Sequence, residues 1–195
     1  MFAAREPVIL QRDLTAVIIP AGEKILLRKG AHMTITQSLG GYTLMDEDGA
    51  LYRVSESEAD ALGLERRVEA SSHATLAAHA SGEPIDQATT ETLVWDALKT
   101  CYDPEIPVNI VELGLVYMCE LFPLGEVGGD GGFRLEVRMT LTAPGCGMGP
   151  VLREDVCQKT LSIPGIKEAN VELVFDPAWD QSRMSEAARL QLGFM

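Results

Sequence analysis

One of the four cysteines in this 195-residue chain lies outside every helical or strand pattern. Cys146 sits in the run GCGMG, residues 145–149, between an alternating apolar segment and Pro150, a residue typical of a first helical turn. Backbone amides at the amino end of a helix favour a thiolate, and glycines leave room beside the sulfur. We therefore expect Cys146 to act as a nucleophile or as a ligand for a soft metal. The alternative is a tight, flexible turn without chemistry.

A second candidate group lies in the segment DPEIPVN, residues 103–109. Two prolines stiffen this segment, which carries the carboxylates Asp103 and Glu105. Two carboxylates and one thiolate hold iron incompletely, so coordination positions stay open for exchange. The alternative is that Asp103 caps the preceding helix and its turn, while Glu105 is a solvated charge.

The residues around Cys146 argue against three familiar arrangements. The loop has no Lys, so it is not a phosphate-binding P-loop. The centre of GCGMG is Gly147 and not the nucleophile, so it is not a nucleophile elbow. All three histidines, His32, His73 and His79, precede residue 88, so a Cys-His pair would need its base from another part of the chain.

The other cysteines fall on apolar patterns. Helical or strand spacing places three of them on the side expected to face the core: Cys101, Cys119 and Cys157. The sequence contains no C-x-x-C pair. The cysteines therefore predict packed, reduced thiols rather than a zinc site or a disulfide framework.

The charge balance is strongly acidic. Asp and Glu number 29 against 16 Lys and Arg, a net charge of −13. Such a surface repels phosphate backbones and anionic lipid, so we expect neither nucleic acid nor a membrane as a partner. Charged residues interrupt the first apolar runs before they reach the length of a signal peptide, which predicts a cytoplasmic protein.

Residues 1–68 predict a small β-rich domain. Short apolar runs indicate strands at 8–10, 16–19, 24–27 and 32–36, and an Asp-Gly turn joins a hairpin of 42–45 and 50–54. Ser55 and Glu58 form a capping box for a helix that continues to about residue 64. An Ala- and Ser-rich linker, residues 69–87, follows.

Residues 88–195 predict an α-β-β-α-β domain with helices packed on a small mixed sheet. Thr89 or Thr90 caps a helix that ends before Asp103, strands follow at 115–122 and 133–142, and a helix from Pro150 leads to a strand at 166–175. A strand-helix-strand connection implies a parallel pair. The fold class is thus α+β, with Thr140 and Thr142 on the polar face of the second strand.

Three runs carry a resemblance to a known family. They are YDPEIPVNIVELGLVY at 102–117, MTLTAPGCGMGPVL at 139–152 and VELVFDPAWDQSRMSEAARLQLG at 171–193. Together they resemble the iron-sulfur cluster assembly domain family, which includes the bacterial SufT proteins of the SUF system, the PaaD accessory proteins and eukaryotic cytosolic targeting factors. The resemblance covers about residues 88 to 193, and the long N-terminal extension is similar to that of the longer SufT proteins.

The resemblance implies a non-enzymatic maturation factor that carries an iron-sulfur cluster, or iron, to client apoproteins. Binding would be transient, a homodimer could hold the cluster between its subunits, and the partners would be the assembly machinery and its clients. The expected metal ligands are Cys146, Asp103 and Glu105, and the expected cluster contacts are Gly145, Gly147, Thr140 and Thr142. Two alternatives remain: a metal-free protein-binding adaptor, and a thiol-based redox or nucleophilic protein that uses Cys146. We expect Trp179 to cover the sheet edge or the core rather than to touch the cargo.

Overall fold

A computed structural model describes residues 6–64, 86–103, 106–125, 132–144 and 147–194. The chain divides into two compact units. The described part of the first comprises residues 6–64, 106–107 and 147–150, and that of the second comprises 86–103, 108–125, 132–144 and 151–194. Both contain sheets and helices, which confirms the α+β class. The predicted domain boundaries stay predictions, because most of the predicted linker lies outside the described residues.

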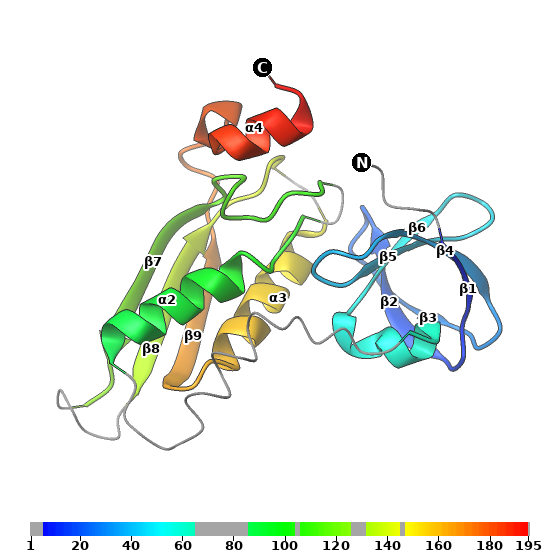
Figure 1. Cartoon of the computed structure of the whole chain (residues 1–195), viewed down its shortest axis with the longest axis horizontal. Helices are drawn as coiled ribbons and strands as arrows, with labels where there is room; N and C mark the ends of the chain where they lie inside the picture. Colours follow the sequence, from blue (N-terminus) through cyan, green and yellow to red (C-terminus); the bar gives the residue numbers. More distant parts are fainter. Residues whose placement is uncertain (1–5, 65–85, 104–105, 126–131, 145–146, 195) are drawn as a thin grey trace. The chain divides into compact units, whose positions relative to one another are not determined.

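The first unit is built on a six-stranded sheet in which every hydrogen-bonded neighbour is antiparallel. The strand order is β1-β4-β5-β6-β2-β3 (Figure 1). The predicted hairpin is present as β5 and β6, and the Asp46 carboxylate accepts hydrogen bonds from the Asp48 and Ala50 amides at its turn. The strands are β1 Glu6–Ile9, β2 Leu14–Ile19, β3 Lys24–Leu27, β4 His32–Gln37, β5 Tyr42–Met45 and β6 Leu51–Val54.

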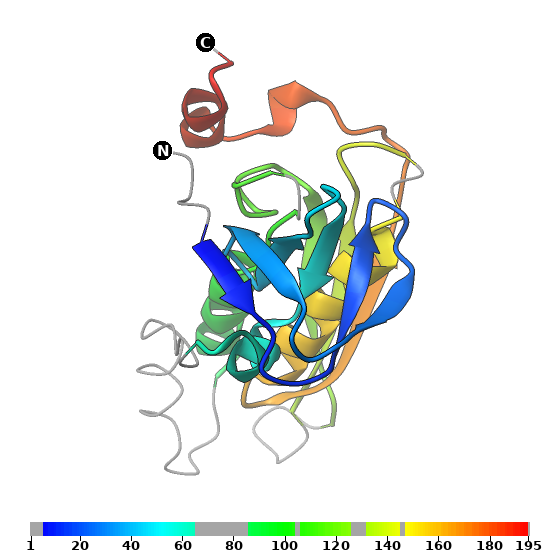
Figure 2. The ribbon, with the colours of Figure 1, turned by 90° about the vertical axis from the view of Figure 1, so that its right-hand side faces the viewer.

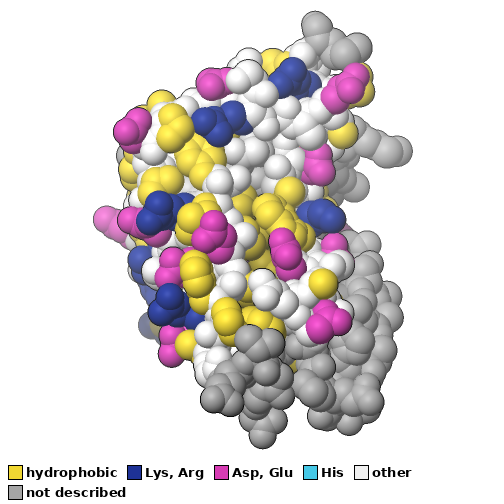
Figure 3. Space-filling model, turned by 90° about the vertical axis from the view of Figure 1, so that its left-hand side faces the viewer, with side chains coloured by type: hydrophobic (Ala, Val, Ile, Leu, Met, Phe, Trp, Pro, Cys, Tyr) yellow, Lys and Arg dark blue, Asp and Glu magenta, His cyan; other side chains and the backbone are white. Residues whose placement is uncertain are grey.

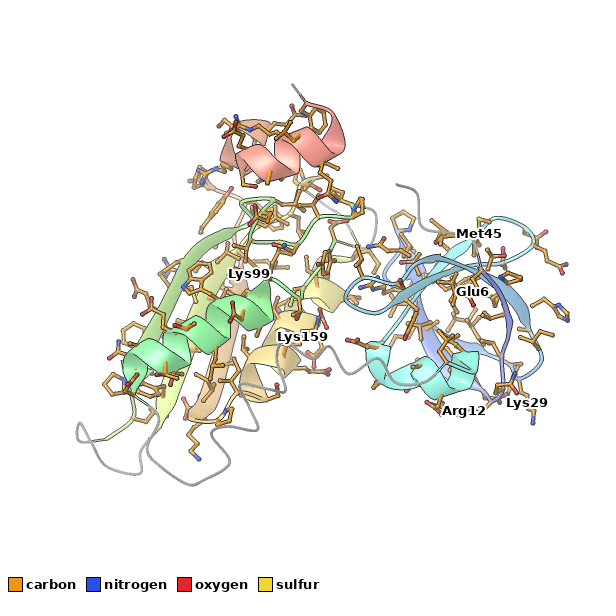
Figure 4. The ribbon with its side chains drawn as sticks, in the orientation of Figure 1. Glu6, Arg12, Lys29, Met45, Lys99 and Lys159 are labelled. Atoms are coloured by element: carbon orange, nitrogen blue, oxygen red, sulfur yellow. The ribbon has the colours of Figure 1, made fainter. Side chains whose placement is uncertain are left out.

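A short helix closes the apolar core of this unit. The strands curve around buried side chains that include Leu10 and Leu44, and the 3-10 helix η1 (Glu56–Leu62) adds Leu62 to the same cluster (Figure 2). Ser55 is the N-cap as predicted, although its hydroxyl accepts from the Ser57 amide and not from Glu58. Arg12, labelled in Figure 4, ties this helix to the sheet through ion pairs with Glu58 and Asp60.

The second unit has the predicted α-β-β-α-β order. The sheet is β7-β8-β9, antiparallel between β7 and β8 and parallel between β8 and β9, and the two long helices lie in front of it in Figure 1. A 3-10 helix and a fourth helix, neither of which was predicted, follow β9. The elements are α2 Gln87–Leu98, β7 Val116–Pro123, β8 Phe133–Met139, α3 Gly149–Leu161, β9 Ile166–Leu173, η2 Gln181–Arg183 and α4 Glu186–Leu192.

The alternating pattern of β8 separates a core face from an open face. Leu135, Val137 and Met139 are buried, as are Leu93 and Val94 of α2. The intervening residues of β8 pair with charges, because Arg134 contacts Glu136 at 3.3 Å and Arg138 contacts Glu172 at 3.2 Å. Period-two patterning therefore predicted the two faces of this strand correctly.

Two predicted boundaries are wrong. The cap of α2 is Asp86, whose carboxylate accepts from the Thr89 amide at 2.7 Å, so Thr89 and Thr90 lie inside the first turn. The strand predicted to reach residue 142 ends at Met139, because the Thr140 amide donates to the Leu115 carbonyl outside the sheet. Thr140 is 1% exposed and does not lie on a polar face, whereas Thr142 is half-buried.

The Asp86 cap predicts a measurable stability loss. Asp86→Ala leaves an amide of the first turn unpaired, and we expect it to lower the free energy of unfolding by about 1 kcal/mol. Thr92→Ala is the matched control, since the exposed Thr92 hydroxyl bonds only within α2 and Ala favours a helix, so its effect stays within about 0.5 kcal/mol. Urea unfolding followed by circular dichroism measures both. Equal stability of the two variants would contradict the capping role.

Candidate functional site

The predicted site residues fall in two loops. Asp103, Thr140, Thr142 and Gly147 are described, and the predictions for Gly145, Cys146 and Glu105 lie outside the described residues. Helix α3 begins at Gly149, one residue before the predicted start. Cys146 thus precedes the first residue of α3 by three positions in the sequence, and its thiolate character stays a prediction.

The loop that contains Asp103 is closed at its base. Tyr102 pairs with Asn109 in an isolated antiparallel bridge, and the Ile110 amide donates to the Cys101 carbonyl at 3.0 Å. The Asn109 side chain continues the turn by accepting from the amides of residues 111 and 112. Asp103 therefore lies just inside a fixed loop entrance.

Asp103 itself is only 6% exposed. Burial of a carboxylate costs free energy unless the group has hydrogen-bonding or charged partners, so protein groups rather than water surround Asp103. Helix α2 ends at Leu98 with Lys99 as the C-cap, so Asp103 lies four residues beyond the cap, and the alternative that it caps the helix end and its turn stays open. Whether Asp103 binds metal stays a prediction.

A lysine from α3 fixes the approach to this loop. The Lys159 ammonium donates to the Thr100 carbonyl at 2.8 Å and pairs with Asp155 at 3.0 Å. Lys159 and Lys99 are both labelled in Figure 4, the first on α3 and the second at the end of α2. One ammonium group therefore joins α3 to the chain segment that leads from α2 to Asp103.

The loop that contains Cys146 begins from a buried residue. Leu141 is 5% exposed, while Ala143 and Pro144 are exposed. One step earlier, the Thr140 amide donates to the Leu115 carbonyl at 2.9 Å. Thr140 thus connects the end of β8 to the loop that follows the Asp103 segment. The predicted contacts of Thr140, Thr142 and Gly147 with a cluster stay predictions.

The remaining cysteines are packed, as predicted. Cys101 is fully buried, and burial raises the pKa of its thiol, as does the negative charge of Asp155. Burial also raises the pKa of the half-buried Cys119 thiol to about 11, with Glu91 and Glu120 contributing. Cys157 is half-buried, and its sulfur lies 3.7 Å from the Ala169 carbonyl oxygen. Because a thiolate, and not a thiol, binds metal, Cys101 and Cys119 are unsuited to ligation near neutral pH.

The side chains available as metal ligands limit what this site could bind. Within the ranges that the structure describes, no group of three or more His, Cys, Asp or Glu residues is arranged to hold a metal ion. Of the three predicted ligands only Asp103 is described, and a single hard carboxylate does not bind an iron-sulfur cluster by itself. A cluster would therefore need donors besides Asp103.

Sequence reasoning missed contacts and elements of the C-terminal segment. The Trp179 indole N–H donates to the Leu113 carbonyl at 2.9 Å and so holds the loop after Asn109, and the expectation that Trp179 covers the sheet edge or the core stays a prediction. The signal for α4 was present in the sequence, since Ser185 and Gly193 flank seven residues with good helix propensity.

The described helices also bear on membrane association. None of those within the described ranges combines the length and apolar character needed for a bilayer crossing. On the face drawn in Figure 3, acidic and basic side chains are interspersed with apolar ones, and the described residues there form no continuous basic patch.

Comparison with known proteins identifies the class. The family model described as iron-sulfur cluster assembly protein matches residues 91–173, from α2 to the end of β9. The Fe-S protein maturation auxiliary factor of Porphyromonas gingivalis is 44% identical over 106 residues, which are 54% of this chain and 93% of that one. The chain therefore belongs to the iron-sulfur cluster assembly protein family.

Two further proteins are similar to part of this chain. The Fe-S protein maturation auxiliary factor SufT of Staphylococcus aureus is 38% identical over 91 residues, 47% of this chain and 94% of that one. A crystal structure of a domain of unknown function, DUF59, from Bacillus anthracis covers 56% of this chain and 96% of its own at 34% identity, with a TM-score of 0.46. The family model includes none of the residues of the six-stranded sheet.

The thiol environments predict selective modification. A pKa of about 11 leaves roughly one Cys119 thiol in a thousand ionised at pH 8, and this fraction rises about tenfold with each pH unit up to 11. We expect iodoacetamide at pH 8 to modify Cys146 well before Cys119 or Cys101, measured by peptide mass spectrometry. All four cysteines should react alike in denaturant, which serves as the control. Equal rates for Cys101 and Cys146 in the folded protein would contradict the assignment.

Proposed function

We propose that this chain is a non-enzymatic maturation factor that binds an iron-sulfur cluster transiently through Cys146 and passes it to client apoproteins. The observation that carries the proposal is the packing of the other three thiols, two of which are held protonated by burial. Cys146 is then the cysteine suited to ligation. Membership of the iron-sulfur cluster assembly family and the similarity to proteins named as Fe-S maturation factors support the same function.

The two carboxylates would let the proposed site release a bound cluster to a client. Iron in a cluster prefers thiolate ligands, and the oxygens of Asp103 and Glu105 are harder and weaker donors. A site with one thiolate and two carboxylates therefore holds a cluster less tightly than a client that offers four thiolates. Ligand exchange then runs toward the client without any chemical step performed by this protein.

Polar groups around the cysteine complete the proposed site. Thr142 is half-buried at the start of the loop, and its hydroxyl is suited to donate to a cluster sulfide. Thr140 is buried, two residues before Thr142, and its amide donates to the Leu115 carbonyl. Its contribution to cluster binding would therefore be to fix the backbone at the end of β8. Gly145 and Gly147 would leave space for the cluster beside the sulfur.

One thiolate per chain also suggests where further ligands come from. A cluster bound between two copies would receive two Cys146 thiolates, which makes a homodimer the simplest carrier. The net charge of −13 and the mixed surface in Figure 3 favour protein partners over nucleic acid or anionic lipid. We place this activity in the cytoplasm, with the cluster assembly machinery and client apoproteins as partners.

Cys146→Ala tests the proposal. The purified chain is reconstituted with iron and sulfide without air, and cluster content is followed by absorption and Mössbauer spectra. We expect clusters in the unmodified protein and in the control Cys119→Ala, and loss of nearly all cluster in Cys146→Ala, because the remaining thiols are packed. Asp103→Asn and Glu105→Gln should retain cluster but release it faster.

The same experiment separates the alternatives. Equal cluster content in Cys146→Ala and the unmodified protein would remove Cys146 from the ligand set. If the purified chain binds no cluster and Cys146→Ser still supports client maturation in cells, the protein is an adaptor. If instead Cys146 is oxidised reversibly without binding iron, it is a redox thiol.

A further inference from the structure

The free edge of β7 is a feature that the function proposed above does not use. In the sheet order β7-β8-β9, the edge strands are β7 and β9, and β7 lies at the left border of this sheet in Figure 1. In the part of the chain that the structure describes, β7 pairs with β8 on one side and with no strand on the other. An edge strand presents unpaired backbone N–H and C=O groups, to which an extended chain can add as a further strand.

The two edges of this sheet differ in their charged side chains. Charges on an edge strand oppose its pairing with another chain. Strand β9 carries three exposed charges among its eight residues: Lys167, Glu168 and Glu172. Strand β7 also has eight residues, and its one charged side chain is Glu120, while Pro123 removes an N–H group only at the last position. The edge of β7 is therefore the less protected of the two.

Three side chains beside this edge form a strip with an acidic centre. Leu135 and Val137 of β8 are buried in the core, so the residues that alternate with them lie on the open face of the sheet. The register of the strand pair places Met118, Glu120 and Phe122 on that open face, and we call these three residues the β7 strip. Glu120 is exposed and its two apolar neighbours are half-buried. Figure 3 shows the side of the molecule that lies on the left in Figure 1, with acidic side chains among apolar ones.

The charge of Glu120 is not balanced by its neighbours. Glu120 lies directly opposite Glu136 in the antiparallel pair, and like charges in that arrangement repel each other. The two arginines of the open face have other partners, because Arg134 contacts Glu136 at 3.3 Å and Arg138 contacts Glu172 at 3.2 Å. None of the described residues forms an ion pair with Glu120. A cation placed beside Glu120 would therefore stabilise this edge.

Contacts within the sheet hold the β7 strip in one conformation. The pairing of β7 with β8 is regular from Met118 to Pro123, and the Leu124 amide extends it by donating to the Gly132 carbonyl at 2.8 Å. The Arg134 guanidinium lies 5.3 Å from the centroid of the Phe122 ring, which fixes the ring on the open face. An edge that is already ordered loses little conformational freedom when a partner binds.

We propose that the free edge of β7 binds an extended segment of a partner protein by β-strand addition. The segment carries Lys or Arg opposite Glu120 and apolar side chains opposite Met118 and Phe122. Main-chain hydrogen bonds to β7 supply affinity, and the ion pair with Glu120 selects the segment. A second copy of β7 is the less suitable occupant, because this strand contains no Lys or Arg. The binding involves neither Cys146 nor a cluster.

Two short blocked peptides test the proposal on the full-length chain. Both have Thr at every other position with Val, a central residue and Val between, and the central residue is Lys in one peptide and Glu in the other. Fluorescence anisotropy of the labelled peptides at low ionic strength measures their affinities. Amide hydrogen exchange of residues 116–123 shows whether a bound peptide pairs with β7, because amides that point away from β8 exchange rapidly until a new strand covers them.

A charge reversal on each edge of the sheet provides the variant and its control. Glu120→Lys reverses the charge of the β7 strip. Glu168→Lys is the matched control, because Glu168 is also exposed and lies on the same open face, but on β9. We expect the unmodified chain and Glu168→Lys to bind the Lys peptide about fivefold more tightly than the Glu peptide, and Glu120→Lys to show the opposite preference.

The outcomes decide between the proposed occupant and the alternatives. Slower exchange of β7 amides with the Lys peptide, together with the reversed preference of Glu120→Lys, supports the proposal. An unchanged preference in Glu120→Lys, or binding without protection of β7, would overturn it. Dimers of the unliganded chain in which the β7 amides are already protected would assign the edge to a second copy, against the proposal. If Glu120→Lys does not fold, Glu120→Gln decides, since it should lose the preference for Lys.

Discussion

The hydrogen bond from the Thr140 amide to the Leu115 carbonyl joins the end of β8 to the segment that follows Asn109. It forms where β8 leaves its pairing with β9, so the end of the sheet and the loop after Asn109 are fixed by the same contact. Lys159 provides a similar link on the helical side through the Thr100 carbonyl. Backbone groups at the ends of β8 and α2 are thus held in place by the sheet and by α3.

Desolvation decides which sulfur is available for chemistry. Cys101 is fully buried and Cys119 half-buried, and their thiols stay neutral because an ion is poorly solvated in the core. The packing of these cysteines is therefore a result of the fold, and hydrophobic periodicity is sufficient to predict it. The reactivity of Cys146 stays a prediction.

Local signals predicted most of the elements. Alternation in β8, the Asp-Gly turn and the helical spacing of α2 are each determined by neighbours in sequence, and the α+β class followed from them. The end of β8 was missed, since it depends on Leu115, 25 residues away. The contacts of the C-terminal segment were missed for the same reason, because Trp179 and Arg183 meet residues 113 and 114 only in three dimensions. The metal ligands, the domain boundaries and the cellular compartment stay predictions.

The contact between Gly114 and Arg183 has an evolutionary consequence. Gly114 has φ +68°, and a Cβ atom added there would clash with the Arg183 carbonyl, so these two segments of the chain are constrained together. Relatives with a larger residue at the position of Gly114 should have lost or rerouted the segment after β9, and relatives that keep the Trp179 position should keep the glycine. The pair thus forms a covariation marker that separates family members with this contact from members without it.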